Sequence, residues 1–198
     1  MFNIMLVHYL TFTSMILLAP CAHGNSGLRE LFQMLSTPHR IWIYAQSYTQ
    51  YYRGRPAGCF AYTKVALGST RYNFTFDIVT DVRTYYLDYF ARLGEDVQGN
   101  AYMIIRGRRN AGPLTKTLKY WNNLKHCGIL TLHRNGRTDC ELLVWDDKIR
   151  RAYEERRNYT DCKNEFRMYC TSGTFLVQFH PRCPNFVPPT EHTKSYCN

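Results

Sequence analysis

A succession of short β-rich segments with turn signals between them is the feature that most constrains the fold. An Asn135-Gly136 pair between two apolar runs predicts a tight hairpin, and we interpret Gly94 as a further turn. The segments are 40–48, 59–67, 71–79, 84–90, 101–107, 114–121, 128–133 and 140–145. Eight consecutive strands predict a mostly-β, eight-stranded up-and-down barrel with room for one small ligand; a β-sandwich is the alternative.

The segments outside this succession predict helices and one last strand. Apolar residues at helical spacing predict a short helix over 28–35, which ends before Pro38. Residues 146–158 are charged and helix-prone but lack a broad apolar stripe, so we interpret them as a solvated segment. A helix is predicted over 161–169 and a strand over 175–179.

The N-terminus indicates export. Residues 1–24 contain no Lys, Arg, Asp or Glu, and their apolar run is followed by the small residues Ala22 and Gly24. This pattern predicts a secretory signal peptide over 1–24. A membrane anchor is the alternative, but the run is shorter than the roughly 20 apolar residues that a spanning helix needs. Residues 25–198 then form one domain in an oxidising, extracellular compartment.

Cysteine usage agrees with export. Cys21 lies in the predicted signal peptide, which leaves seven cysteines, at 59, 127, 140, 162, 170, 183 and 197. These predict disulfides, and a zinc site is disfavoured because the sequence contains no Cys-x-x-Cys pair. The odd number leaves one thiol over, and Cys197 is our candidate for it. Asn73 and Asn158 begin Asn-x-Thr triplets and are candidate N-glycosylation sites.

Several of these residues stand together as they do in a known family. The predicted first helix is followed by an aromatic strand over 43–48, and Gly58-Cys59-Phe60 opens the next strand. A late hairpin consists of Leu118-Lys119-Tyr120-Trp121, Cys127-Gly128-Ile129, the Asn135-Gly136 turn and Cys140-Glu141-Leu142-Leu143. The tail then carries Cys162, Phe166, Cys170 and Cys183. With this arrangement the chain resembles the tick salivary lipocalins of the histamine-binding group over nearly its whole mature length. The resemblance implies a lipocalin β-barrel, with a C-terminal helix tied to it by disulfides, in a protein secreted into saliva.

The resemblance also implies a disulfide pattern. The implied pairs are Cys59–Cys183 and Cys127–Cys162, and we add Cys140–Cys170 as a third. Each bond closes a long loop and is expected to stabilise the fold by roughly 3–4 kcal/mol. Together they would hold the C-terminal helix against the barrel wall.

Family members that bind histamine or serotonin share a Cys-Asp-aliphatic triplet, a later Glu-Leu-aromatic triplet and a further cysteine. This chain keeps Cys127 and Glu141, but Gly128 replaces the acid and Leu143 replaces the aromatic residue. A buried ammonium ligand needs a carboxylate partner and gains from aromatic faces. The resemblance therefore implies one amine site at Glu141, and Trp145 lies on the same side of its strand as Leu143 and can add an aromatic wall. An exposed carboxylate at the barrel mouth is the alternative for Glu141.

Aromatic residues on the predicted strands are further candidates, because alternation turns about half of them inward. With Glu141 and Trp145, the candidate ligand-binding residues are Tyr44, Tyr62, Phe76, Tyr102 and Tyr120. An apolar cavity with a few tyrosine hydroxyls also suits a lipid mediator such as a leukotriene or a fatty acid. The basic strand residues Lys64, Arg71, Arg106 and Lys116 are candidates to pair with an acidic head group, or else lie on a solvated outer face.

The sequence predicts a binding protein and no enzyme. Its histidines are scattered, and it contains neither His-x-x-x-His nor Gly-x-Ser-x-Gly. We expect no cofactor, no metal site, no nucleic-acid partner and no membrane partner, and we expect a monomer. The predicted function is sequestration of a host amine or lipid mediator, which evades host inflammatory and immune responses. The alternative is a binder of a host complement, coagulation or immune-cell protein, with the barrel as scaffold; the loops and basic clusters of this chain, whose net charge is +10, would then matter.

Overall fold

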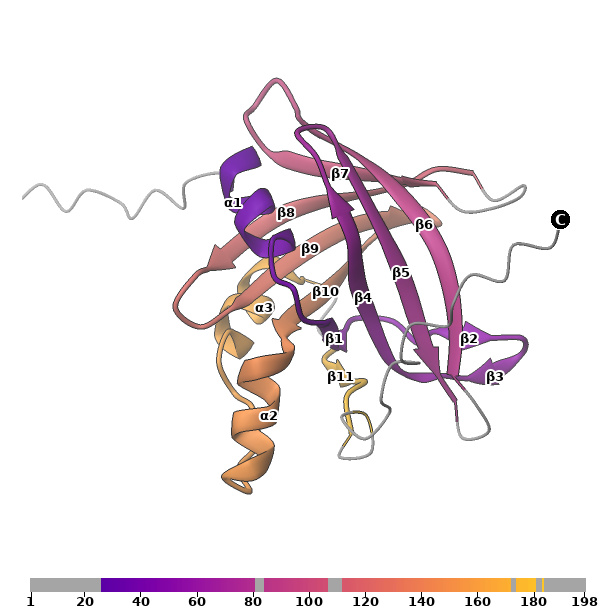
Figure 1. Cartoon of the computed structure of the whole chain (residues 1–198), viewed down its shortest axis with the longest axis vertical. Helices are drawn as coiled ribbons and strands as arrows, with labels where there is room; N and C mark the ends of the chain where they lie inside the picture. The colour runs from indigo at the N-terminus through magenta and orange to yellow at the C-terminus, as the bar shows by residue number, and fades with distance from the viewer. Residues whose placement is uncertain (1–25, 81–83, 107–111, 172–173, 181–182, 184–198) are drawn as a thin grey trace, which may run out of the picture.

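Eight antiparallel strands form a closed barrel in the computed structural model, which describes residues 26–80, 84–106, 112–171, 174–180 and 183. The strands are β1 (Ile41–Gln46), β4 (Gly58–Leu67), β5 (Arg71–Val79), β6 (Thr84–Glu95), β7 (Ala101–Arg106), β8 (Leu114–Asn122), β9 (Cys127–Arg134) and β10 (Arg137–Trp145). Neighbours in this order pair antiparallel, and β1 also pairs with β10 (Figure 1). This closure confirms the predicted barrel and excludes the sandwich.

Alternation along the strands separates a lumen face from an outer face. On β5, Tyr72, Phe74 and Phe76 are buried in the lumen, whereas Arg71 and Asn73 are exposed outside. Inward residues from all eight barrel strands join one apolar cluster. A second cluster lies on the outer face, where the C-terminal segment covers the barrel. The lumen is therefore lined mainly by apolar and aromatic side chains.

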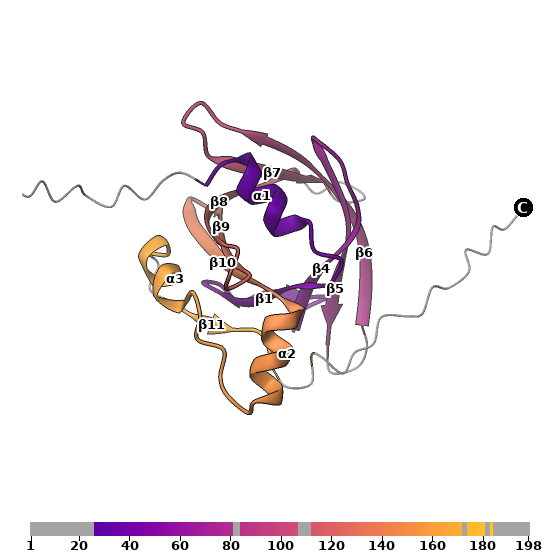
Figure 2. The ribbon, with the colours of Figure 1, turned by 60° about the vertical axis from the view of Figure 1, so that its left-hand side comes forward.

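One end of the barrel, the closed end, is covered by α1 (Leu28–Leu35), the helix that the sequence predicts over the same residues. Figure 2 shows α1 lying across this end. Leu31, Met34 and Leu35 are fully buried in the lumen cluster. Two contacts satisfy one free backbone group at each end of the helix: the Leu28 N–H donates to the Glu95 carboxylate (2.6 Å), and the Trp145 indole N–H donates to the Met34 carbonyl (2.9 Å). The opposite end, beside the β9–β10 turn, is the mouth.

Gly94 does not form the turn that we predicted from the sequence. Strand β6 continues through it to Glu95. A Cβ atom at Gly94 would lie 2.7 Å from the hydroxyl oxygen of Tyr102, which is its partner on β7. The glycine therefore makes room for a cross-strand aromatic ring and does not end the strand.

The C-terminal segment packs against the outside of the barrel as α2 (Asp146–Glu154), α3 (Lys163–Tyr169) and the short strand β11 (Leu176–Val177). We predicted a solvated segment over 146–158, but Ile149 and Ala152 of α2 are buried in the outer cluster. The indole N–H of Trp42 also donates to the Asp146 carboxylate (2.6 Å), which fixes the start of α2 on β1.

Three disulfides tie this segment to the barrel, in the pairs that the sequence analysis proposes. They are Cys59–Cys183, Cys127–Cys162 and Cys140–Cys170. Strand β11 pairs with the mouth half of β1, and the Cys59 N–H donates to the Gln178 carbonyl (3.2 Å). Residues 176–178 therefore bridge β1 and β4 where these two strands separate.

The mouth carries a small hairpin of β2 (Tyr51–Tyr52) and β3 (Arg55–Pro56). No helix within the described ranges is long and apolar enough to cross a membrane. The predicted signal peptide over 1–24 and the odd cysteine, Cys197, lie outside the described residues.

Candidate ligand site

A cavity of about 220 Å³ lies in the mouth half of the lumen. Its walls are apolar and aromatic: Phe74, Phe76, Tyr89, Ile105, Leu114 and Leu132. Its floor is polar and consists of Tyr62, Lys116 and Glu141, and Tyr48, Gln50 and Arg134 lie around its rim. Beyond the floor, toward α1, the lumen is filled by the apolar cluster. The cavity available to a ligand therefore lies in the mouth half of the barrel.

An ion pair between Lys116 on β8 and Glu141 on β10 forms the floor. The Lys116 ammonium lies 2.6 Å from both carboxylate oxygens of Glu141. Lys116 is 4% exposed and Glu141 is 1% exposed. Removal of two charges from water is costly, and close pairing with further hydrogen bonds offsets that cost. Each of these two buried charges is therefore stabilised by the other.

Two tyrosine hydroxyls complete the hydrogen bonding of Glu141. Tyr48 donates to Oε1 (2.6 Å), and Tyr62 donates to Oε2 (3.2 Å). Burial raises the pKa of the Tyr62 hydroxyl well above its usual value, and the negative charge of Glu141 raises it further. The same two causes raise the pKa of Tyr48. Both hydroxyls therefore stay protonated and remain hydrogen-bond donors at neutral pH.

Arg134 is the accessible cation of the cavity. Its guanidinium lies 4.1 Å from the centre of the Tyr48 ring, and its Nε lies 3.3 Å from the Asp139 carboxylate. Its side chain is 42% exposed, in contrast to the buried Lys116. Since a guanidinium carries five N–H donors, Arg134 keeps donors that can meet a polar group arriving from solvent.

The structure brings three of the seven candidate ligand-binding residues together around this cavity. Glu141, Tyr62 and Phe76 all line it. Trp145 also lies on the inner side of its strand, but at the closed end, where it packs against Trp121 and the lumen cluster. The proposed aromatic wall at Trp145 thus lies beside α1 and does not line the cavity.

The other three aromatic candidates lie on the outer face. Tyr102 alternates with the inward residues Met103 and Ala101 and covers Gly94. Tyr44 alternates with the inward Ile43, and its hydroxyl donates to the Tyr159 carbonyl (3.0 Å). None of the three belongs to the lining of the lumen cavity in the described part of the chain.

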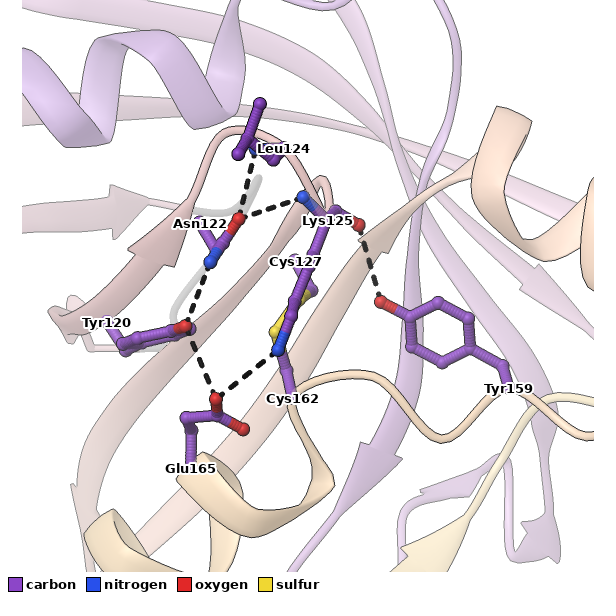
Figure 3. Close-up of a disulfide and its surroundings, with 8 residues drawn as sticks. All are labelled: Tyr120, Asn122, Leu124, Lys125, Cys127, Tyr159, Cys162 and Glu165. Atoms are coloured by element: carbon purple, nitrogen blue, oxygen red, sulfur yellow. Dashed lines mark hydrogen bonds and ion pairs between the residues drawn. A yellow bond between two sulfur atoms is a disulfide. The ribbon is translucent and has the colours of Figure 1, made fainter.

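Tyr120 lies outside for a different reason. Simple alternation from the inward Leu118 would turn it into the lumen, but the register between β8 and β9 shifts between these two residues. Tyr120 therefore faces α3, where its hydroxyl donates to Glu165 (3.4 Å), beside the Cys127–Cys162 bond (Figure 3). Asn122 joins the same network by donating to the Tyr120 hydroxyl (3.2 Å). These contacts hold α3 on the barrel and leave Tyr120 no part in the cavity.

Packing at the closed end explains the glycine at position 128. A Cβ atom there would lie 2.6 Å from the Met34 sulfur of α1 and 3.1 Å from the Tyr120 carbonyl. The volume next to Gly128 is therefore occupied by the helix. Leu143, which pairs with Gly128 across β9 and β10, is also buried in the lumen cluster. Neither position can contact a ligand in the mouth cavity.

Sequence reasoning missed the importance of Lys116, Tyr48 and Arg134. Lys116 was only one of four basic candidates, and a solvated outer position was the alternative for each. Its place between Leu114 and Leu118, two apolar residues of the same parity, was the available signal for an inward side chain. Arg71 and Arg106 do lie on the exposed outer face.

Within the described ranges, one group of residues has the types and spacing of a metal site: Cys59, His180 and Cys183. It gives little support for metal binding. The two sulfurs are joined to each other in a disulfide, so neither is a thiolate ligand.

Solved structures with the same architecture identify the fold. A protein named AM182, solved as a serotonin complex, superposes with a TM-score of 0.56 at 13% identity, covering 78% of this chain and 92% of that one. Japanin from Rhipicephalus appendiculatus, solved with cholesterol, superposes with a TM-score of 0.52 at 11% identity, covering 75% and 97%. The chain has the lipocalin fold. No family model and no curated protein matches the sequence.

The lipocalin barrel accounts for the position of the cavity. An eight-stranded barrel is wide enough to hold one small ligand, and here α1 and the apolar cluster fill the half next to the closed end. The mouth half keeps a lumen cavity of about 220 Å³. The residues of its floor and rim therefore determine which ligand chemistry the cavity can accept.

Proposed function

We propose that this chain is a secreted lipocalin of tick saliva that captures a small amphipathic host molecule in its mouth cavity. Capture requires affinity and abundance and needs no turnover, so we propose a binding protein and no enzyme. The two structural neighbours were solved with serotonin and with cholesterol, which supports small-ligand binding by a protein of this architecture. The proposed consequence is a lower free concentration of a host mediator and a weaker host inflammatory response.

The observation that carries the choice of ligand combines three features of the cavity. Its walls are apolar, its floor residues already pair with one another, and a cation is accessible at its rim. Glu141 already accepts from Lys116 and from two tyrosines, so it offers little to an added ammonium group. Arg134, by contrast, is half exposed and can meet a carboxylate. We therefore favour a slender acid, with its apolar part against Phe74 and Phe76 and its head group at Arg134, over an amine.

The volume of the cavity favours a small guest. About 220 Å³ lies below the roughly 300–1,000 Å³ typical of pockets for drug-sized ligands. A medium-chain fatty acid fits this volume better than a sterol does. An eicosanoid such as leukotriene B4 would extend past the rim into solvent.

Calorimetry of the oxidised protein tests this proposal with a panel of decanoate, arachidonate, leukotriene B4, cholesterol, serotonin and histamine. We expect decanoate to bind and cholesterol not to bind. Arg134→Gln should weaken decanoate binding by about 10–100-fold, because one charge-assisted hydrogen bond is lost. Arg137→Gln is the matched control, since Arg137 pairs with Arg134 across the hairpin and lies outside the cavity lining. Equal losses in both variants, or no binding of any acid, would contradict the proposal.

A groove on the outer face of β5 and β6 favours a second function, recognition of a host protein. The groove has a volume of about 980 Å³ and is lined by Arg71, Arg92 and Arg106, with Asp88 as its carboxylate. Phe90 and Val65 are 51% and 68% exposed beside it. Arginines around an exposed aromatic residue suit an acidic protein surface.

Asn73, a predicted glycosylation site, also lines this groove. A glycan there would cover the surface, so the second function requires an unglycosylated Asn73. Mass spectrometry of the secreted protein decides between the two: full occupancy of Asn73 removes the groove as a protein-binding surface. Asn158 is exposed as well and provides the comparison site.

A further inference from the structure

The side chain of Lys116 crosses the lumen and uses every donor it has. It begins on β8 and reaches Glu141 on β10 and Tyr62 on β4. Its Nζ lies 2.6 Å from each Glu141 oxygen and 2.6 Å from the Tyr62 hydroxyl. A lysine ammonium has three N–H donors, so all three are satisfied.

The groups around this ammonium are those that would bind the ammonium of a ligand. A buried carboxylate supplies the counter-charge, and the Tyr62 hydroxyl supplies a further acceptor 2.6 Å from Nζ. Because Glu141 is 1% exposed, water contributes little to its stabilisation. The position therefore requires a cation, and the chain provides one from its own wall.

We propose that Lys116 occupies an ammonium-binding site in the lumen and thereby excludes amine ligands from it. The inference rests on the proposed function only in taking the lumen as the ligand site. An entering amine would have to displace Nζ from Glu141 and leave the Lys116 charge buried without a partner, which is strongly unfavourable. Lys116 is thus the residue that decides between amines and other ligands.

The direct test is removal of the charge at position 116. Lys116→Met keeps most of the side-chain volume and leaves the carboxylate without a cation. We expect calorimetry to show that this variant binds serotonin or histamine at least about 100-fold more tightly than the natural chain does, in line with the energy of a buried charge pair. The matched control is Lys116→Met combined with Glu141→Gln, which restores neutrality and should lose the amine affinity.

A second variant covers the case in which Lys116→Met does not fold. Lys116→Ala deletes the atoms of n-propylamine, so added n-propylamine should raise the unfolding temperature of Lys116→Ala or restore its refolding. It should leave the natural chain unchanged. n-Propanol, which has a similar size and no charge, is the control additive.

Two results would overturn the inference. One is amine binding by the natural chain as tight as that by Lys116→Met. The other is that neither variant responds to any of the three amines. Failure of the proposed function looks different, because the acid panel is measured on the natural chain with Lys116 in place. An amine response in the variants together with no acid binding by the natural chain would reject the proposed ligand and keep this inference.

Discussion

The two ends of the lumen exclude an amine ligand by different means. At the closed end, position 128 has no side chain, and Met34 of α1 fills the space beside it. Toward the mouth, the carboxylate of Glu141 is kept, but Lys116 neutralises it. One end is therefore closed by packing and the other is balanced by charge. An acidic residue in the lumen is therefore not a free amine site when a cation of the same chain pairs with it.

The largest effect is expected at the charged end. Glu141→Gln leaves the Lys116 ammonium buried without its counter-charge and should lower the free energy of unfolding by about 3–5 kcal/mol. Urea denaturation of the oxidised protein measures this loss. The double variant Glu141→Gln, Lys116→Met removes both charges and should recover most of it. An unchanged urea midpoint in the single variant would show that the ion pair contributes little and would remove the contrast between the ends.

A smaller effect is expected at the packed end. Gly128→Ala adds a methyl group that meets the Met34 sulfur and the Tyr120 carbonyl, so we expect a loss of about 1–3 kcal/mol from overpacking. The same urea experiment applies. Gly112→Ala is the control, because a Cβ atom there meets nothing within 4 Å. Equal stability of the two alanine variants would mean that α1 moves aside easily and that the closed end is open to a ligand.

The smallest effect concerns the contact that holds α1 in place. Trp145→Phe removes the indole N–H that donates to the Met34 carbonyl and should lower the free energy of unfolding by about 1 kcal/mol. Amide hydrogen exchange in α1 should become faster. Trp121→Phe is a matched control, because the Trp121 indole N–H has no hydrogen-bond partner among the described residues and its ring packs on Trp145. Faster exchange in both variants would assign the effect to ring packing.

Local pattern predicted the strands and the first helix, whereas the pairing of β1 with β10 decided for the barrel against the sandwich. Consecutive β-rich segments with hairpin turns gave the eight barrel strands, and the helix over 28–35 has the predicted bounds. The segment after β10 was misjudged because Ile149 and Ala152 form too narrow a stripe to stand out among charged neighbours. Its burial depends on disulfides and on Trp42, which are distant in sequence.

The site was harder to predict, because it depends on the partners of each side chain. Glu141, Tyr62 and Phe76, three of the seven candidates, line the cavity, but no local pattern shows that Glu141 meets Lys116 in the lumen. Register shifts also defeated simple alternation, as at Tyr120. A single extra residue in one strand reverses the face of every side chain that follows.

The bridge that residues 176–178 form between β1 and β4 has a consequence for how the protein is made. A ribosome delivers the chain from its N-terminus, so β1 and β4 are synthesised long before the segment that bridges them, and Cys59 waits for a partner 124 residues later. Until then the mouth ends of these two strands present unpaired backbone edges, which invite pairing with other chains. We expect forms that stop before β11 to aggregate.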